Sequence, residues 1–288
     1  MHSVIVDMLK AAAPRSLDEH VRVLHEILQQ VALLGLWRGG LFQHAAFYGG
    51  TALRLLHGLD RFSEDLDFSL LEPDAAFDFS ELSSTLREEL AAFGFDLRVE
   101  SRKPSAGSAI RSAFLKGGTR EQLLVLSVSQ DLVRLVQHGK EIKIKLEIDT
   151  DPPSGFGTEM RSLFHPLPFA VRAYTLPDLL AGKMHALLCR GWKSRVKGRD
   201  WYDLVWYAGH APQMRLLHLE VRMRQSGHWK DKRPLDEKLW RGLMESRIAA
   251  LDVDQARDEV ARFVYDPRSL ELWSRDFFRE AARRIKVV

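Results

Sequence analysis

Residues 140–149 contain the clearest pattern in the chain, a strict alternation of apolar and charged side chains. The apolar positions are Ile142, Ile144, Leu146 and Ile148, and the charged positions between them are Lys143, Lys145, Glu147 and Asp149. Successive side chains of a strand point to opposite faces of its sheet. The pattern therefore predicts a strand with one buried face and one charged face.

The rest of the first half mixes strand and helix patterns. Ser16 to Glu19 matches a capping box, and apolar residues at helical spacing follow it, which predicts a helix from Ser16 onward. We also expect helices at 51–57 and 80–93, a loop at 103–108, and strands at 44–48, 65–70, 96–102, 109–116, 122–129 and 167–174. From Thr175 onward the pattern is helical, with helices expected at about 175–189, 200–210, 213–225, 235–250, 252–263 and 268–286.

These elements predict a bilobed α+β protein. Residues 1–174 would form a mixed sheet with helices, and residues 175–288 a mostly α-helical domain. A chain of 288 residues is long enough for two such domains.

Charge is distributed unevenly along the chain. Residues 1–150 carry 17 basic and 21 acidic side chains, a net −4, whereas residues 151–288 carry 25 and 18, a net +7. Five basic residues fall close together in the second half, and we interpret them as candidate RNA-binding residues: Arg190, Lys193, Arg195, Lys197 and Arg199. The alternative is an exposed, solvated basic loop.

The single cysteine, Cys189, excludes an internal disulfide and fits a reducing compartment. It lies in an apolar helical run, so we interpret it as a buried thiol rather than a nucleophile. The eleven histidines show no ligand spacing, and we interpret His44, His57 and His185 as packing or surface residues. The N-terminus has no basic leader, and no apolar run reaches the roughly 20 residues needed to span a bilayer. We expect a soluble cytoplasmic protein that is a monomer and does not contact membranes.

One stretch combines features of a metal and nucleotide site. Gly49, Gly50 and Thr51 stand at an expected helix start, where glycines allow close backbone approach and the helix N-terminus favours phosphate. Asp65 and Asp67 share a strand face, and two adjacent carboxylates repel unless a cation such as Mg²⁺ or Mn²⁺ lies between them. Glu147 is a candidate third ligand. An Asp-x-Asp pair on a strand is also typical of a solvated face.

Two further acids and a lysine lie in the second half. Lys183, on an otherwise apolar helix, must reach a carboxylate, a phosphate or water. Asp200 and Asp203 are one helical turn apart, and they either cap their helix or hold Arg and Lys side chains. The chain contains neither a P-loop motif nor a Gly-x-Gly-x-x-Gly turn, which argues against those two nucleotide-binding folds.

Taken in order, these motifs resemble the AbiEii/MenT-type nucleotidyltransferase toxins of the DNA polymerase β-like superfamily, which belong to type IV toxin–antitoxin systems. The motifs are Gly50-Thr51, Asp65-x-Asp67, Lys145-x-Glu147, Lys183 and Arg199-Asp200-x-x-Asp203, and they cover about residues 48–204. Thr51 replaces the serine that is commoner in the family. The resemblance implies a nucleotidyltransferase-like N-terminal domain, with a helical domain that contributes Lys183 and Asp200 to the site.

The resemblance also implies transfer of a nucleoside monophosphate from an NTP to an acceptor, most simply the 3′ end of tRNA, with arrest of translation and growth. Asp65 and Asp67 would bind Mg²⁺, Lys183 would contact the triphosphate, Asp200 would complete the site, and Lys145 would bind nucleotide. Ser63 either contacts nucleotide, is modified, or is a plain turn serine. A cognate antitoxin protein is an expected partner.

Other functions remain open at this stage. The chain could transfer the nucleotide to a protein or a small molecule instead of RNA. It could also be a catalytically idle RNA-binding module, as the basic second half would allow, or a structural protein that binds a partner through its charged strand face.

Overall fold

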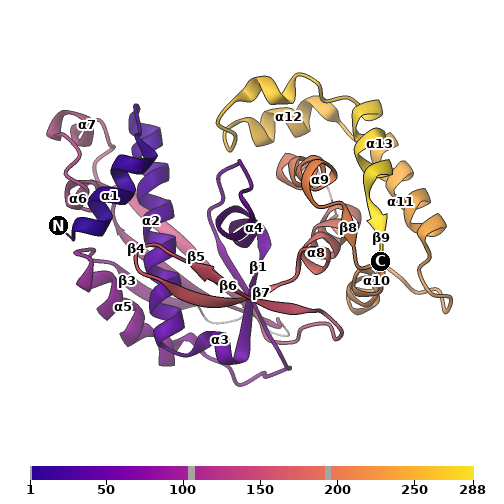
Figure 1. Cartoon of the computed structure of the whole chain (residues 1–288), viewed down its shortest axis with the longest axis horizontal. Coiled ribbons are helices and arrows are strands. Elements are labelled where there is room, and N and C mark those ends of the chain that lie inside the picture. Colours follow the sequence, from indigo (N-terminus) through magenta and orange to yellow (C-terminus); the bar gives the residue numbers. More distant parts are fainter. Residues whose placement is uncertain (1, 103–107, 192–195) are drawn as a thin grey trace. The chain divides into compact units, whose positions relative to one another are not determined.

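The computed structural model describes residues 2–102, 108–191 and 196–288. Their contacts divide the chain into two compact units (Figure 1). The first unit comprises Met1–Leu56, Glu64–Pro152 and Met160–Ala173, and the second comprises His57–Ser63, Pro153–Glu159 and Tyr174–Val288. None of the helices in the described residues is both long enough and apolar enough to cross a membrane.

A seven-stranded mixed sheet with the order β3-β4-β5-β2-β1-β7-β6 is the central element of the fold. Its strands are β1 (Ala45–Tyr48), β2 (Leu66–Leu70), β3 (Arg98–Arg102), β4 (Ile110–Gly118), β5 (Glu141–Asp149), β6 (Thr158–Leu163) and β7 (Phe169–Tyr174). Strand β2 runs antiparallel to β1 and parallel to β5. The α+β class and six of the seven strands are confirmed, while β6 was not predicted.

The alternation along β5 separates a core face from a charged face. The four apolar side chains of the strand are at most 5 % exposed, whereas Lys143 is exposed and Glu147 half-exposed. The buried face joins Leu66 and Phe68 of β2 in one apolar core. Helices α2 (Leu17–Arg38) and α5 (Ser83–Ala92) pack together over this core, α2 against β5 and α5 against β3. Ser16 caps α2 as predicted, because its Oγ accepts a hydrogen bond from the Glu19 amide at 3.2 Å.

The remaining helices of the first unit are shorter. They are α1 (Ser3–Ala12), α3 (Leu41–His44), α4 (Gly49–His57), the 3₁₀ turn Phe79–Leu82, α6 (Thr119–Val125) and α7 (Gln130–Arg134). The strand predicted at 122–129 is wrong, since this segment is α6 and the turn after it. Leu123 and Leu126, three positions apart, are buried, while Leu124 between them is 50 % exposed. That spacing suits a helix, but a short apolar run is equally typical of a buried strand.

The second unit is mostly helical, as expected for the C-terminal part of the chain. Its helices are α8 (Leu176–Cys189), α9 (Gly198–His210), α10 (Leu216–Gln225), α11 (Glu237–Ala249), α12 (Val253–Ala261) and α13 (Arg275–Arg284), with a 3₁₀ turn at Pro267–Leu270. Two short parallel strands, β8 (Gln213–Met214) and β9 (Lys286–Val287), pair with each other. The single helix predicted at 268–286 is wrong, because Ser274 caps a new helix within it by accepting from the Phe277 amide.

Candidate functional site

A close approach between Gly49 and Asp67 organises the junction of β1, α4 and β2. Tyr48, the last residue of β1, is in register with Asp67 of β2, and α4 begins at the next residue, Gly49. Gly49 has a φ of +86°, and a Cβ atom there would lie 2.2 Å from Asp67 Oδ2. Only glycine combines this backbone conformation with this free space. The Asp67 carboxylate therefore lies against the first residue of α4.

Thr51 supports the same junction from inside the core. Its side chain is fully buried, and its Oγ1 donates a hydrogen bond to the Asp65 carbonyl oxygen at 2.5 Å. This bond fixes the backbone directly before β2. Gly50 is also buried, in the first turn of α4. Contact of Gly50 or Thr51 with a nucleotide remains a prediction.

Asp67 and Glu147 are neighbours across the parallel pairing of β2 and β5. The two residues are in register, and each follows an apolar residue, Leu66 or Leu146, that is fully buried on the other face. Asp65, just before β2, is half-exposed like Asp67. Asp67 and Glu147 thus lie on the charged side of two adjacent strands, as the alternation predicted, and Asp65 comes directly before β2.

Two side chains of the sheet hold Glu147. Its Oε1 lies 2.6 Å from Lys145 Nζ and accepts a hydrogen bond from Ser112 Oγ at 3.3 Å. Lys145 lies two positions away on the same face of β5, and its positive charge offsets part of the repulsion between neighbouring carboxylates. Lys145 and Glu147, predicted to bind nucleotide and metal respectively, are therefore brought together.

The ligand types on this face are those a hard divalent cation prefers, although the three carboxylates, all in the described part of the chain, do not come within 4.8 Å of one another as a group. Asp65, Asp67 and Glu147 offer carboxylate oxygens, the ligand type that Mg²⁺ and Mn²⁺ prefer, and all three are accessible in part. Gly49 keeps the space beside Asp67 free of a side chain. An ion bound there would compete with Lys145 for the Glu147 oxygens.

In the second unit, Asp203 of α9 is held by two cations. Arg61 donates from Nε to Asp203 Oδ1 at 2.7 Å and from Nη2 to Oδ2 at 2.8 Å, while Lys183 Nζ lies 2.7 Å from Oδ2. The Asp203 side chain is fully buried, and those of Arg61 and Lys183 are 3 % and 15 % exposed. The interpretation that Asp203 holds Arg and Lys side chains is confirmed.

The charges of this trio do not cancel. Burial opposes ionisation of Asp203, but Arg61 and Lys183 outweigh it and lower the pKa of its carboxyl to about 2. Within this trio one carboxylate faces two cations, and the nearby carboxylate of Asp200 also acts on Arg61. The part played by Arg61 was missed in the sequence, because its partner lies 142 positions away and nothing near Arg61 indicates burial.

Asp200 and the basic segment before it also form contacts within the second unit. Asp200 is 3 % exposed, and its Oδ2 lies 3.2 Å from Arg190 Nη1. The guanidinium of Arg199 lies over the Phe263 ring at 4.1 Å. Burial and the nearby charge of Arg190 lower the pKa of Lys197 to about 8. Three of the five predicted RNA-binding residues, Arg190, Lys197 and Arg199, thus interact with other groups of the protein. The other two, Lys193 and Arg195, lie outside the described residues.

Ser63 is only 7 % exposed. The amide of the preceding residue, Phe62, donates to the Phe263 carbonyl at 2.7 Å, which fixes this stretch of chain beside the end of α12. Modification of Ser63 would therefore require local opening of the segment.

Comparison with known proteins adds independent findings. The family model described as nucleotidyl transferase AbiEii toxin, type IV toxin–antitoxin system, matches residues 31–283. No curated protein matches the sequence significantly. Among solved structures, the fold is similar to MenT4, a nucleotidyltransferase toxin from Mycobacterium tuberculosis H37Rv, with 16 % identity, a TM-score of 0.58, and coverage of 98 % of this chain and 88 % of that one. A candidate nucleotidyltransferase from H. pylori gives 18 % identity, a TM-score of 0.50 and 91 % coverage of both chains.

Proposed function

This chain belongs to the AbiEii family of nucleotidyltransferase toxins of type IV toxin–antitoxin systems, and we propose that it transfers a nucleoside monophosphate from an NTP to RNA, with the 3′ end of tRNA as the preferred acceptor. The observation that carries the proposal is the register of Asp67 with Glu147 beside Gly49. It supports a divalent cation next to the N-terminus of a helix, where phosphate is favoured.

The proposed reaction joins an acceptor hydroxyl oxygen to the α-phosphorus of the NTP. The bond from that phosphorus to the oxygen bridging to the β-phosphate breaks, pyrophosphate leaves with the bonding electrons, and the hydroxyl proton passes to a base. Divalent ions held by Asp65, Asp67 and Glu147 would promote ionisation of the hydroxyl and offset charge on the pyrophosphate.

The chain's own groups would bind the triphosphate. Backbone N–H groups at Gly49 and Gly50 stand at the N-terminus of α4, where the helix dipole favours anions. Lys145 would exchange part of its contact with Glu147 for a phosphate oxygen. Asp203 also has a bidentate pair with Arg61, so Lys183 could exchange its contact with Asp203 for a phosphate oxygen, which supports the triphosphate contact proposed for Lys183. We also propose that Asp200 completes the nucleotidyltransferase site.

Basic surface in the second unit supports a nucleic-acid acceptor. A cavity of about 530 Å³ there is lined by Arg241, Arg283, Arg284 and Lys286, and by Glu237, which pairs with Arg241. Such a concentration of cations suits a phosphate backbone. NTPs and tRNA are cytoplasmic, so we place the reaction there. Membership of a type IV toxin–antitoxin family supports a cognate antitoxin as a further partner.

A transfer assay tests the proposal. Purified protein is incubated with Mg²⁺, total tRNA and each labelled NTP in turn, and the products are separated. We expect label in RNA, none after chelation, and recovery on adding Mg²⁺ or Mn²⁺. Asp67→Asn and Glu147→Gln should each lower the transfer rate by roughly 10²- to 10³-fold, because each removes a carboxylate that would hold the divalent ions that stabilise the transition state.

Glu141→Gln is the matched control, since Glu141 lies on β5 on the same face as Glu147 but is exposed and paired with Arg98 at 2.6 Å. This variant should transfer normally. Undiminished transfer by Asp67→Asn would overturn the proposed site. If label appears in a protein or a small product and none appears in RNA, that molecule is the acceptor instead of RNA. If the protein binds RNA but transfers no label under any of these conditions, it is a non-catalytic RNA-binding protein.

A further inference from the structure

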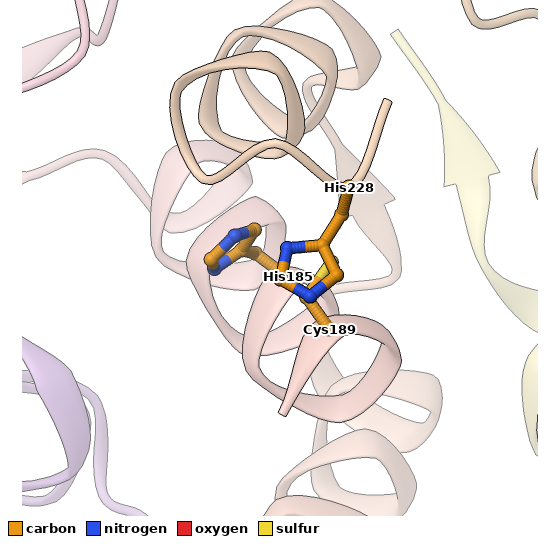
Figure 2. Close-up of side chains that lie close together, drawn as sticks. All are labelled: His185, Cys189 and His228. Carbon is orange, nitrogen blue, oxygen red and sulfur yellow. The ribbon is translucent and has the colours of Figure 1, made fainter. Parts of the chain in front are cut away.

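Three side chains that can ligate a soft metal ion converge in the second unit. His185 and Cys189 are four positions apart on α8, so they share one helix face. His228 follows α10 and points toward that face (Figure 2). One ligand atom from each of the three residues lies within 4.8 Å of the other two. The sequence spacing did not indicate that His185 meets Cys189 and His228, because His228 lies on a distant turn.

The backbone after α10 fixes the position of His228. Gly227 has a φ of +74°, which ends the helix in a left-handed residue. The amides of His228 and Trp229 both donate to the Met223 carbonyl, at 2.8 and 3.0 Å. The turn is thus held by hydrogen bonds to α10, and the His228 side chain extends from a defined point.

Ser226 links the two imidazoles. Its Oγ lies 2.9 Å from His185 Nε2 and 3.0 Å from His228 Nδ1, and it donates to the Met223 carbonyl at 3.2 Å. A hydroxyl has one proton, so once that proton is given to the carbonyl both imidazole nitrogens must donate to Oγ. The lone pairs then lie on His185 Nδ1 and His228 Nε2. Metal-binding histidines commonly donate their second ring N–H in this way.

The surroundings favour a neutral imidazole and require a thiol to lose its proton. Burial and the nearby Arg222 lower the pKa of His185 to about 4, so its ring is uncharged near neutral pH. Burial raises the pKa of the Cys189 thiol to about 11, while Arg247 acts in the opposite direction. A bound cation would take the place of the thiol proton, as in other cysteine-containing metal sites.

We propose that His185, Cys189 and His228 form a binding site for zinc or another borderline-soft divalent transition metal, which ties the turn after α10 to α8. One thiolate and two imidazoles are the ligand types that zinc prefers, and three protein ligands leave a fourth position for water. Zinc bonds of about 2.0–2.3 Å place tetrahedral ligands roughly 3.3–3.7 Å apart, so the side chains must close by about 1 Å. The site differs in chemistry from the carboxylate face of β2 and β5, which offers only oxygen ligands, and the proposal does not depend on the proposed transferase activity.

Metal binding to the tag-free protein tests this site directly. Zinc is titrated against a chromophoric chelator, and cobalt is substituted to reveal a thiolate-to-cobalt charge-transfer band. We expect one equivalent of metal in the wild type and loss of the band in Cys189→Ser. His228→Gln should weaken zinc binding by at least about 100-fold and Ser226→Ala by about 10-fold, as expected for the loss of a ligand and of a ligand's hydrogen-bond partner.

The side chain of His228 is exposed, so His228→Gln should fold normally. This variant therefore still tests the site if Cys189→Ser fails to fold. Zinc should raise the melting temperature of the wild type and leave that of His228→Gln unchanged. His138→Gln, which removes an exposed histidine of the first unit, should bind zinc like the wild type. Equal zinc affinity in the wild type and His228→Gln, or no charge-transfer band in the wild type, would overturn the site.

Discussion

Arg61 and Asp203 form a bidentate ion pair, at 2.7 and 2.8 Å, although 142 positions separate them in the chain. Both side chains are almost completely withdrawn from water, at 3 % and 0 % exposure. The pair attaches the segment His57–Ser63 to α9 within the second unit, and an isolated bridge between Arg61 and Val264 adds to that attachment. Removing one member leaves a charge in a place where water cannot solvate it.

Arg61→Ala should therefore destabilise the protein strongly. Asp203 would keep Lys183 but lose both guanidinium hydrogen bonds, and breaking a buried pair typically costs about 3–5 kcal/mol. The free energy of unfolding, from urea titration, measures the effect. Arg268→Ala is the matched control, because Arg268 pairs with Asp266 at 82 % and 52 % exposure, and its loss should change stability by less than about 1 kcal/mol. Equal effects of the two variants would contradict this account.

Stability should fall in acid partly through Asp203. Its folded-state pKa of about 2 is below the ordinary value of 3.8, so its contribution is fully present above about pH 4 and is lost as the pH falls toward 2. This pKa shift corresponds to a contribution of about 2 kcal/mol to the free energy of unfolding, because the Asp203 side chain is fully buried. Urea unfolding at pH 5 and pH 3 should show a steeper loss in the wild type than in Asp203→Asn. Parallel losses in both proteins would exclude Asp203 as a source of the acid sensitivity.

Gly49→Ala should damage activity more than its backbone strain alone predicts. The new Cβ would be 2.2 Å from Asp67 Oδ2, so the carboxylate must move, and we expect transfer to fall by roughly 10²-fold or more. Gly58→Ala provides the comparison, because Gly58 has a similar φ of +78° with nothing within 4 Å of a Cβ atom. Both variants should lose about 1–2 kcal/mol from the left-handed backbone, measured by urea titration. Transfer assays should separate them, and an active Gly49→Ala would argue against a catalytic Asp67.

Lys183→Met tests the triphosphate contact apart from stability. Asp203 retains its bidentate partner Arg61, so the variant should be less destabilised than Arg61→Ala. Loss of a charged hydrogen bond to phosphate should raise the KM for NTP by roughly 10- to 100-fold. Steady-state transfer kinetics at saturating RNA measure this change. A normal KM would restrict Lys183 to a structural role beside Asp203.

Local patterns predicted much of the sheet. The alternation along β5, the glycines at the start of α4 and the cap at Ser16 each involve residues a few positions apart, and each is seen in the structure. Predictions failed where a short apolar run suited two periodicities, as at α6, or where a cap interrupted a longer helical pattern, as at Ser274. The half-exposed strand β6 had no strong apolar alternation and was not predicted.

The sequence by itself determined the class of fold, the order of the motifs and the carboxylates and cations available to a nucleotidyltransferase, because periodicity and residue chemistry are local properties. The tertiary structure decided which of these groups meet. The strand register places Asp67 beside Glu147. Arg61 and Asp203 form a buried ion pair, and a turn after α10 brings His228 close to His185 and Cys189. Such pairings depend on how distant segments share a core, and the free energy of that packing is not encoded in any short stretch of chain.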